Sequence, residues 1–185
     1  MTQRLTTLLF IGSLLIAASC SKKDEAEENS NELITTIELK VTEQGTNNTM
    51  SFEFEDLDGP GGQAPEIDLI SLEANKVYNV KMEIYDKSKS PAVEIDEEVE
   101  EEGASHRIYI EPSSGSNIVV SNLDNDNTGK PLGLNSVWTT SGDGTGTVKI
   151  TLRHYENGGK EASDPVNSTK SNTDAEVVFN VAVSN

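Results

Sequence analysis

Basic, aromatic and cysteine residues are all scarce in this chain of 185 residues. Fourteen lysines and arginines stand against 32 aspartates and glutamates, which gives a net charge of −18. A chain of this charge is repelled by phosphate backbones, so nucleic-acid binding is excluded. Aromatic residues make up 5%, which is few for a sugar-stacking cleft. No serine-hydrolase, zinc-protease or phosphate-loop motif occurs. We therefore expect a non-enzymatic protein.

Long apolar runs are also rare, and hydrophobic residues are only 34% of the chain. The longest run follows Arg4, extends from Leu5 to Ile16, and ends in the small residues 17–19 before Cys20. This order is typical of an export signal over residues 1–19. At about twelve residues, the run is shorter than the roughly 20 that a membrane-spanning helix needs. We expect the mature chain to have no transmembrane helix.

Cys20 is the only cysteine, so it cannot form an internal disulfide. The sequence Ala17-Ala18-Ser19-Cys20 resembles a bacterial lipobox, in which the cysteine is lipidated and anchors the protein to a membrane. Residues 20–32 are polar and acidic, which predicts a disordered tether. A cysteine followed by lysines and then acidic residues also resembles the surface-export signal of Bacteroidota lipoproteins. That resemblance implies the outer face of the outer membrane, and a tether that faces the periplasm is the alternative.

From residue 33 onward, short runs of alternating apolar and polar residues are separated by Gly, Asn and Asp. This alternation predicts half-buried antiparallel strands, and their number and spacing favour an all-β fold, an immunoglobulin-like antiparallel β-sandwich, as a single domain over 33–185. The buried anchor of this sandwich is predicted to be Trp138. The expected strands are Leu33–Val41, Met50–Glu55, Ile67–Leu72, Val77–Tyr85, Arg107–Glu111, Asn117–Ser121, Ser136–Thr140, Thr147–Tyr155 and Ala175–Val183.

The domain also shows an internal echo between residues of about 33–90 and 106–185. At an offset of 66 positions, Phe52, Phe54, Leu57-Asp58 and Pro65 match Ile118, Val120, Leu123-Asp124 and Pro131. In the long strands the offset is 70, where Tyr78, Val80, Met82 and Tyr85 match Val148, Ile150, Leu152 and Tyr155. This match predicts two related halves. Neither half is large enough to bury its apolar face alone, so we expect the halves to pack as one domain. Generic strand periodicity is the alternative explanation.

Residues of about 91–103 interrupt the strand pattern and predict a short acidic helix that links the halves. Ser90 stands as a cap, Pro91 takes the first helical position, and Gly103 ends the segment. Its apolar face would consist of Ala92, Ile95 and Val99. Seven of the nine residues from 94 to 102 are acidic. Negative charges at the carboxyl end of a helix are unfavourable, so this segment invites a compensating cation.

The chain has two histidines. His106 follows the acidic segment by four residues, and His154 stands at the end of a long predicted strand. Glu98, Glu101, Glu102 and His106 form a plausible ligand set for a divalent ion such as Zn²⁺ or Ca²⁺, and His154 joins them if the fold brings the two strand ends together. The alternative is a solvated acidic face with His154 as an ordinary rim residue. The sequence establishes no cofactor beyond this candidate.

Two glycine-containing turns place oxygen-bearing side chains at alternate positions, as calcium loops do. The first turn contains Asp56 and Asp58, and the second contains Asp124 and Asp126. Asp and Gly are also the residues that reverse a chain between strands. Structural turns are therefore the alternative, and the first turn lacks the later ligand positions of a helix–loop–helix calcium site.

Several of these segments together resemble a family of small Bacteroidota outer-membrane lipoproteins: the lipobox, Asp56-Leu57-Asp58-Gly59, the acidic run before His106, Trp138-Thr139-Thr140 and Leu152-Arg153-His154. Some members carry the label of a type 1 periplasmic-binding fold, a doubly wound α/β architecture that the strand-only pattern contradicts. The resemblance implies an outer-membrane location, a β domain and association with a TonB-dependent receptor. We expect a ligand- or partner-binding accessory lipoprotein, with divalent-metal binding as the alternative.

Overall fold

The computed structural model describes residues 33–156 and 159–185, so the expected signal peptide and tether lie outside the described residues. The regular elements of the described chain are strands, apart from one short helix, α1 (Asp96–Glu101), and a 3-10 turn, η1 (Ser114–Ser116). No helix in this part of the chain has the length and apolarity to cross a bilayer. The strands are β1 (Thr36–Glu43), β2 (Thr49–Glu55), β3 (Glu66–Ile67), β4 (Ile70–Glu73), β5 (Val77–Asp86), β6 (Val93–Glu94), β7 (His106–Pro112), β8 (Ile118–Ser121), β9 (Asn135–Thr140), β10 (Gly144–His154) and β11 (Asn172–Ser184).

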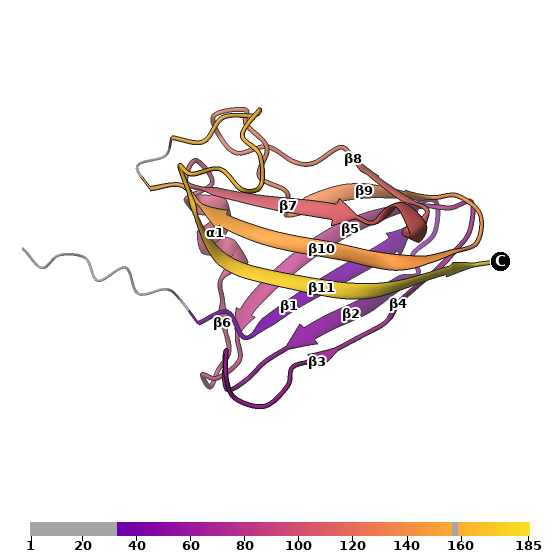
Figure 1. Cartoon of the computed structure of the whole chain (residues 1–185), viewed down its shortest axis with the longest axis horizontal. Helices are drawn as coiled ribbons and strands as arrows, with labels where there is room; N and C mark the ends of the chain where they lie inside the picture. The colour runs from indigo at the N-terminus through magenta and orange to yellow at the C-terminus, as the bar shows by residue number, and fades with distance from the viewer. Residues whose placement is uncertain (1–32, 157–158) are drawn as a thin grey trace, which may run out of the picture. The chain divides into compact units, whose positions relative to one another are not determined.

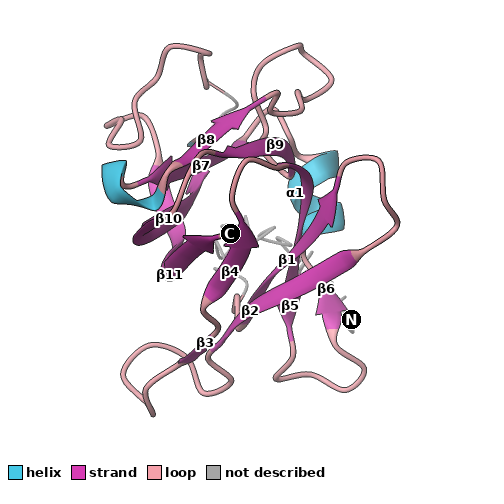
Figure 2. Cartoon of the chain, turned by 90° about the vertical axis from the view of Figure 1, so that its right-hand side faces the viewer, coloured by secondary structure: helices cyan, strands magenta, loops and turns pink. Residues whose placement is uncertain are grey.

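These strands form two sheets. The large sheet has the order β3-β2-β1-β5-β9-β8, with β6 also paired to β5, and the small sheet has the order β4-β11-β10-β7. Figure 1 shows the small sheet in front of the large one, and Figure 2 shows the strands from one end. All pairs are antiparallel except β4 with β11, which is parallel. The predicted all-β sandwich is confirmed, and its immunoglobulin-like character stays a prediction.

The core lies between the two sheets because every second residue of each central strand points inward. Trp138 on β9 is fully buried, and its indole Nε1 donates a hydrogen bond of 3.0 Å to Ser136 Oγ. The predicted anchor role of this residue is confirmed. The long strands contribute Tyr78, Val80, Met82 and Ile84 from β5, Val148, Ile150 and Leu152 from β10, and Val177, Phe179, Val181 and Val183 from β11.

The single strand predicted over Ile67–Leu72 is in fact two strands in different sheets. Asp68 interrupts the run: its backbone N–H donates to Glu53 O, and its carboxylate accepts a hydrogen bond from Glu53 N. These contacts end β3 against β2, and the chain then crosses to pair with β11. Alternation of residue types cannot distinguish one six-residue strand from two short ones on opposite sheets.

The helix predicted over 91–103 is shorter than expected. Val93–Glu94 forms β6 and pairs with β5, and the backbone N–H of Ile95 donates to a backbone carbonyl of β5 at 2.8 Å. Ile95 then precedes α1, so the predicted serine cap is not made. Of the three apolar residues assigned to one face, Ile95 and Val99 are buried, whereas Ala92 lies before β6 and is exposed. Pairing with a neighbouring strand therefore replaces the first turn and a half of the expected helix.

The long strands that carry the internal echo occupy equivalent places. Each pairs antiparallel with the first strand of its own half, β5 with β1 and β10 with β7. The other matched strands differ, since β2 lies beside β1 whereas β8 lies beside β9. The origin of the domain by duplication stays a prediction.

Candidate functional site

The register of the small sheet brings the two histidines together. In the antiparallel pair β7–β10, Ile108 lies opposite Leu152, and His106 lies directly opposite His154. The histidines therefore terminate two neighbouring inward-facing rows of apolar side chains. Their ring centroids are 4.7 Å apart, with the ring planes tilted by 36°. His106 is buried and His154 is half-buried.

A third donor, Asp174, reaches the same place through an irregularity in β11. Leu152 pairs with Ala175 and Arg153 pairs with Thr173, so Asp174 is the extra residue of a β-bulge. A bulge re-aims the side chain of its unpaired residue. The carboxylate of Asp174 lies 4.0 Å from His154 Nδ1. One ligand atom from each of His106, His154 and Asp174 lies within 4.8 Å of the others, and we call these three residues the His–His–Asp site.

His106 is held in one tautomer by the end of the helix. Its Nδ1 lies 3.3 Å from the backbone carbonyl of Glu102. A carbonyl oxygen can only accept a hydrogen bond, so Nδ1 carries the proton and Nε2 presents a lone pair. Metal-ligating histidines are commonly oriented in this way by a backbone carbonyl. Glu102 thus acts through its main chain, and its side chain is exposed.

Burial sets the protonation of the site. It is the main cause that lowers the pKa of His106 to about 4, and the nearby His154 adds to the effect. At neutral pH the His106 ring is therefore uncharged, which is the form that binds metals. Burial also raises the pKa of Asp174, an effect opposed by His154 and Arg153. A half-buried carboxylate with a raised pKa is stabilised in its charged form by a neighbouring cation.

Two imidazole nitrogens and a carboxylate oxygen suit Zn²⁺ and similar transition-metal ions. Calcium instead takes six to eight oxygen ligands, so this donor set does not suit it. A tetrahedral zinc centre with bonds of about 2.0–2.1 Å sets its ligand atoms about 3.3 Å apart. The widest separation of the donors, up to 4.8 Å, must therefore close by about 1.5 Å.

The expected carboxylate ligands on the helix do not join this group. The side chains of Glu98, Glu101 and Glu102 are exposed, and within the described ranges the His–His–Asp site is the one cluster with suitable spacing. Glu98 acts only through its charge, which raises the pKa of His106 slightly against the larger opposing effect of burial. Asp174 carried no sequence signal, because the alternation set by Val177 places position 174 on the outer face.

The second aspartate turn serves as structure. Asp124 Oδ1 accepts a hydrogen bond of 2.7 Å from Gly133 N, and Oδ2 accepts one from Asn135 Nδ2. Asp126 Oδ1 accepts bonds of 2.7 Å from both the N–H and the hydroxyl of Thr128. These carboxylates satisfy backbone donors of the loop between β8 and β9, which favours the structural-turn alternative.

The first aspartate turn follows β2. Asp56 N–H donates to Thr35 O at 2.7 Å, and the Asp58 carboxylate accepts from Gln63 N at 3.0 Å. Neither aspartate belongs to a cluster with metal-ligand spacing in the described part of the chain. The Asp58 contact again favours a structural turn, closed by a side chain of the turn itself.

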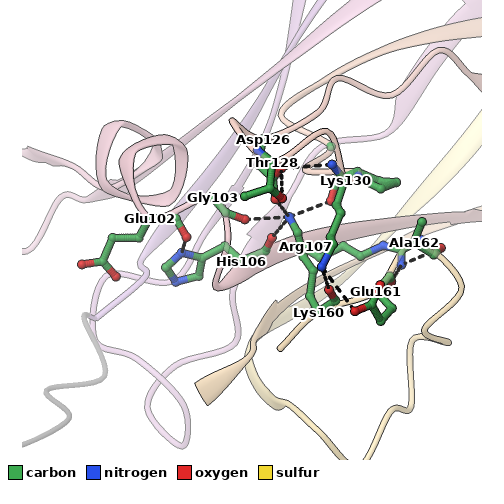
Figure 3. A network of polar contacts seen from close by, with 12 residues as sticks. Glu102, Gly103, His106, Arg107, Asp126, Thr128, Lys130, Lys160, Glu161 and Ala162 are labelled. Atoms are coloured by element: carbon green, nitrogen blue, oxygen red, sulfur yellow. Dashed lines mark hydrogen bonds and ion pairs between the residues drawn. The ribbon is translucent and has the colours of Figure 1, made fainter. Parts of the chain in front are cut away.

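The remaining oxygen of Asp126 pairs with a fully buried lysine. Lys160 Nζ lies 2.9 Å from Asp126 Oδ2 and donates to the backbone carbonyls of Gly103, His106 and Pro131 at 2.6, 2.6 and 2.8 Å. Figure 3 shows this fan of contacts beside the His106–Glu102 bond. We call Lys160 with these four partners the Lys160 clamp. It fixes the main chain on both sides of His106 and fills an oxygen-lined socket with the protein's own cation.

Both members of the buried pair are shifted. Burial alone would raise the pKa of Asp126, but hydrogen bonds from Lys160 and Thr128 hold it well below its ordinary value. Burial lowers the pKa of Lys160, and Asp126 opposes that shift. No pattern in the sequence singles out this lysine, since it lies in the long loop between β10 and β11, far along the chain from its partners.

Comparison with protein-family models, curated proteins and solved structures finds no match to this chain. The geometry of the His–His–Asp site and the chemistry of its three donors therefore carry the functional assignment.

Proposed function

We propose that this protein binds a divalent transition-metal ion, Zn²⁺ in the first place, at the His–His–Asp site. The observation that carries the proposal is the convergence of three donor groups from three neighbouring strands of the small sheet. The fixed tautomer of His106 supports it, because its Nε2 lone pair is available without any change of protonation. Two nitrogen donors favour Zn²⁺ over the Ca²⁺ that the acidic composition alone also allowed.

The same proposal specifies the ligand of the accessory lipoprotein that the sequence predicts. We propose that this non-enzymatic lipoprotein binds a metal ion, is anchored through the lipidated Cys20, and has an outer-membrane receptor as its partner. The net charge of −18 supports a cation as ligand, because the field of the whole protein concentrates cations near its surface. The anchor, the surface location and the receptor belong to the proposal alone.

Titration calorimetry and thermal unfolding of the full-length protein with Zn²⁺ and Ca²⁺ test the metal site. Zn²⁺ should release or absorb measurable heat and should stabilise the folded state by about 2.7 kcal/mol when its free concentration is 100 times its dissociation constant. Both effects should be lost in His154→Ala and Asp174→Asn, whose side chains are half-buried and tolerate replacement.

Glu101→Gln is the matched control, because it removes an acidic side chain of the helix that lies outside the site. It should bind Zn²⁺ as the unaltered protein does. Absence of any heat or stabilisation with Zn²⁺ would refute the proposal. Equal loss of binding in Glu101→Gln and Asp174→Asn would show that general negative charge, and not the His–His–Asp site, attracts the ion.

A further inference from the structure

The His–His–Asp site supplies too few donors to surround a metal ion. We infer, on the basis of the proposed function, that an ion held there keeps one coordination position open to solvent, and that this position accepts a neutral imidazole donor from outside the chain. Zinc sites that serve only as structural staples are closed by four protein ligands, whereas sites with three protein ligands hold an exchangeable fourth.

The exposed fractions of the three donor side chains show on which side of the ion the open position lies. His106 lies at the base, with 7% of its surface exposed, whereas the side chains of His154 and Asp174 are 28% and 19% exposed. The site therefore sits where the core of the sandwich meets water. The buried side of the ion faces His106 and the apolar rows behind it, so a fourth ligand can approach only past His154 and Asp174.

Neighbouring groups of the described chain do not fill the fourth position. The ammonium of Lys160 is fully buried and engaged in its clamp, and a cation cannot ligate a metal. Glu102 uses its main-chain carbonyl to orient His106. Glu98 is the helix carboxylate whose charge is felt at His106, and its side chain is exposed. Glu98 therefore contributes to the electrostatic field at the open position and does not serve as a ligand there.

That field selects the kind of donor. A divalent ion with one carboxylate ligand carries a local charge of about +1, which by itself would attract anions. Seven acidic residues between positions 94 and 102 and a net charge of −18 oppose the approach of any anion. A neutral nitrogen donor pays no such electrostatic penalty. Imidazole, the side-chain group of histidine, is the neutral donor that divalent transition metals bind readily.

The test uses the full-length protein loaded with Co²⁺, whose visible absorption reports its coordination. Titration with imidazole should change the spectrum in a saturable way, and azide, a small anion, should bind at least tenfold more weakly. Glu98→Gln should reduce the ratio between the affinities for imidazole and for azide, because removal of one negative charge favours binding of the anion. Metal content measured after gel filtration distinguishes a ternary complex from extraction of Co²⁺.

Each outcome bears on a separate statement. If Co²⁺ binds and imidazole leaves the spectrum unchanged or merely removes the metal, the open position is refuted while the proposed function stands. If azide binds as tightly as imidazole, the preference for a neutral donor is wrong. If Co²⁺ does not bind at all, the proposed function fails first and the inference falls with it.

Discussion

Replacement of Lys160 with methionine should destabilise the domain more than changes of charge at its surface. Methionine has nearly the length of lysine but carries no charge and donates no hydrogen bond. The change leaves the buried Asp126 carboxylate oxygen without its cation and takes the donor away from the carbonyls of Gly103, His106 and Pro131. The packing volume is nearly kept, so the loss is mainly electrostatic.

The expected magnitude follows from the burial of the pair. Both side chains are inaccessible to solvent, and removal of one partner from a buried ion pair typically costs about 3–5 kcal/mol. The lost hydrogen bonds to the three carbonyls do not add to this figure in full, because the desolvation of the ammonium no longer opposes folding. We expect a loss of about 3–5 kcal/mol, which is a large part of the roughly 5–15 kcal/mol that stabilises an ordinary domain.

Urea unfolding followed by fluorescence measures this loss. Trp138 is the only tryptophan and is fully buried, so its emission reports the folded core. The matched control is Lys170→Met, because Lys170 pairs with Asp164 at 2.8 Å while its side chain is 51% exposed. Exposed pairs contribute about 0–1 kcal/mol. A Lys160→Met variant within about 1 kcal/mol of the control would refute the assignment of the clamp as a stabilising element.

A double-mutant cycle identifies the partner. Asp126→Asn keeps an acceptor for Thr128 and removes the negative charge that faces Lys160. The loss in the double variant should be smaller than the sum of the two single losses, by about 0.5–3 kcal/mol, which is the usual range for residues in direct contact. Additive losses would show that the two side chains act independently.

Three further outcomes are expected. The pKa of His106 is about 4 in the folded protein, whereas its ordinary value is 6.5. Between these pH values the unfolded chain binds more protons than the folded one. The free energy of unfolding of the metal-free protein should therefore fall by roughly 3 kcal/mol as the pH drops from 6.5 to 4. Denaturation curves of His106→Gln should lack that fall, and an unchanged pH profile would contradict it. Gly133→Ala should lower the free energy of unfolding in urea by about 2–3 kcal/mol, because φ at this position is +100° and the new Cβ would lie 2.7 Å from Ile108 O. Gly129→Ala is the control: its φ is +82° and the space around it is open, so the loss should be only about 1 kcal/mol. Mass spectrometry of the native protein should find fatty acids on an amino-terminal Cys20, and a free thiol there would overturn the predicted anchor.

The strands were predictable because the sandwich imposes a local rule. Burial of one face of each sheet demands an apolar residue at every second position, and that demand is visible in the runs that became β5, β10 and β11. The buried place of Trp138 followed from the same alternation. The division of residues 67–72 between two sheets did not, because Asp68 ends β3 through hydrogen bonds to Glu53, a residue of the neighbouring strand β2.

The helix shows where local signals compete with tertiary pairing. Charge and glycine placement indicated a short acidic helix, and Ile95 and Val99 did become its buried side. Its start was misplaced because Val93–Glu94 pairs with β5, and a backbone that completes a sheet gains partners that an isolated helical turn does not offer.

The sequence by itself determined the strand pattern, the acidic character and the two histidines worth following, because each of these depends on residue type and near neighbours. Only the tertiary structure decided which groups meet. The register of β7 against β10 places His106 opposite His154, a bulge in β11 turns Asp174 toward them, and Lys160 reaches back to the start of β7 from a distant loop. Register, bulges and loop contacts are set by bonds between residues far apart in the chain, and such bonds leave no period in the sequence.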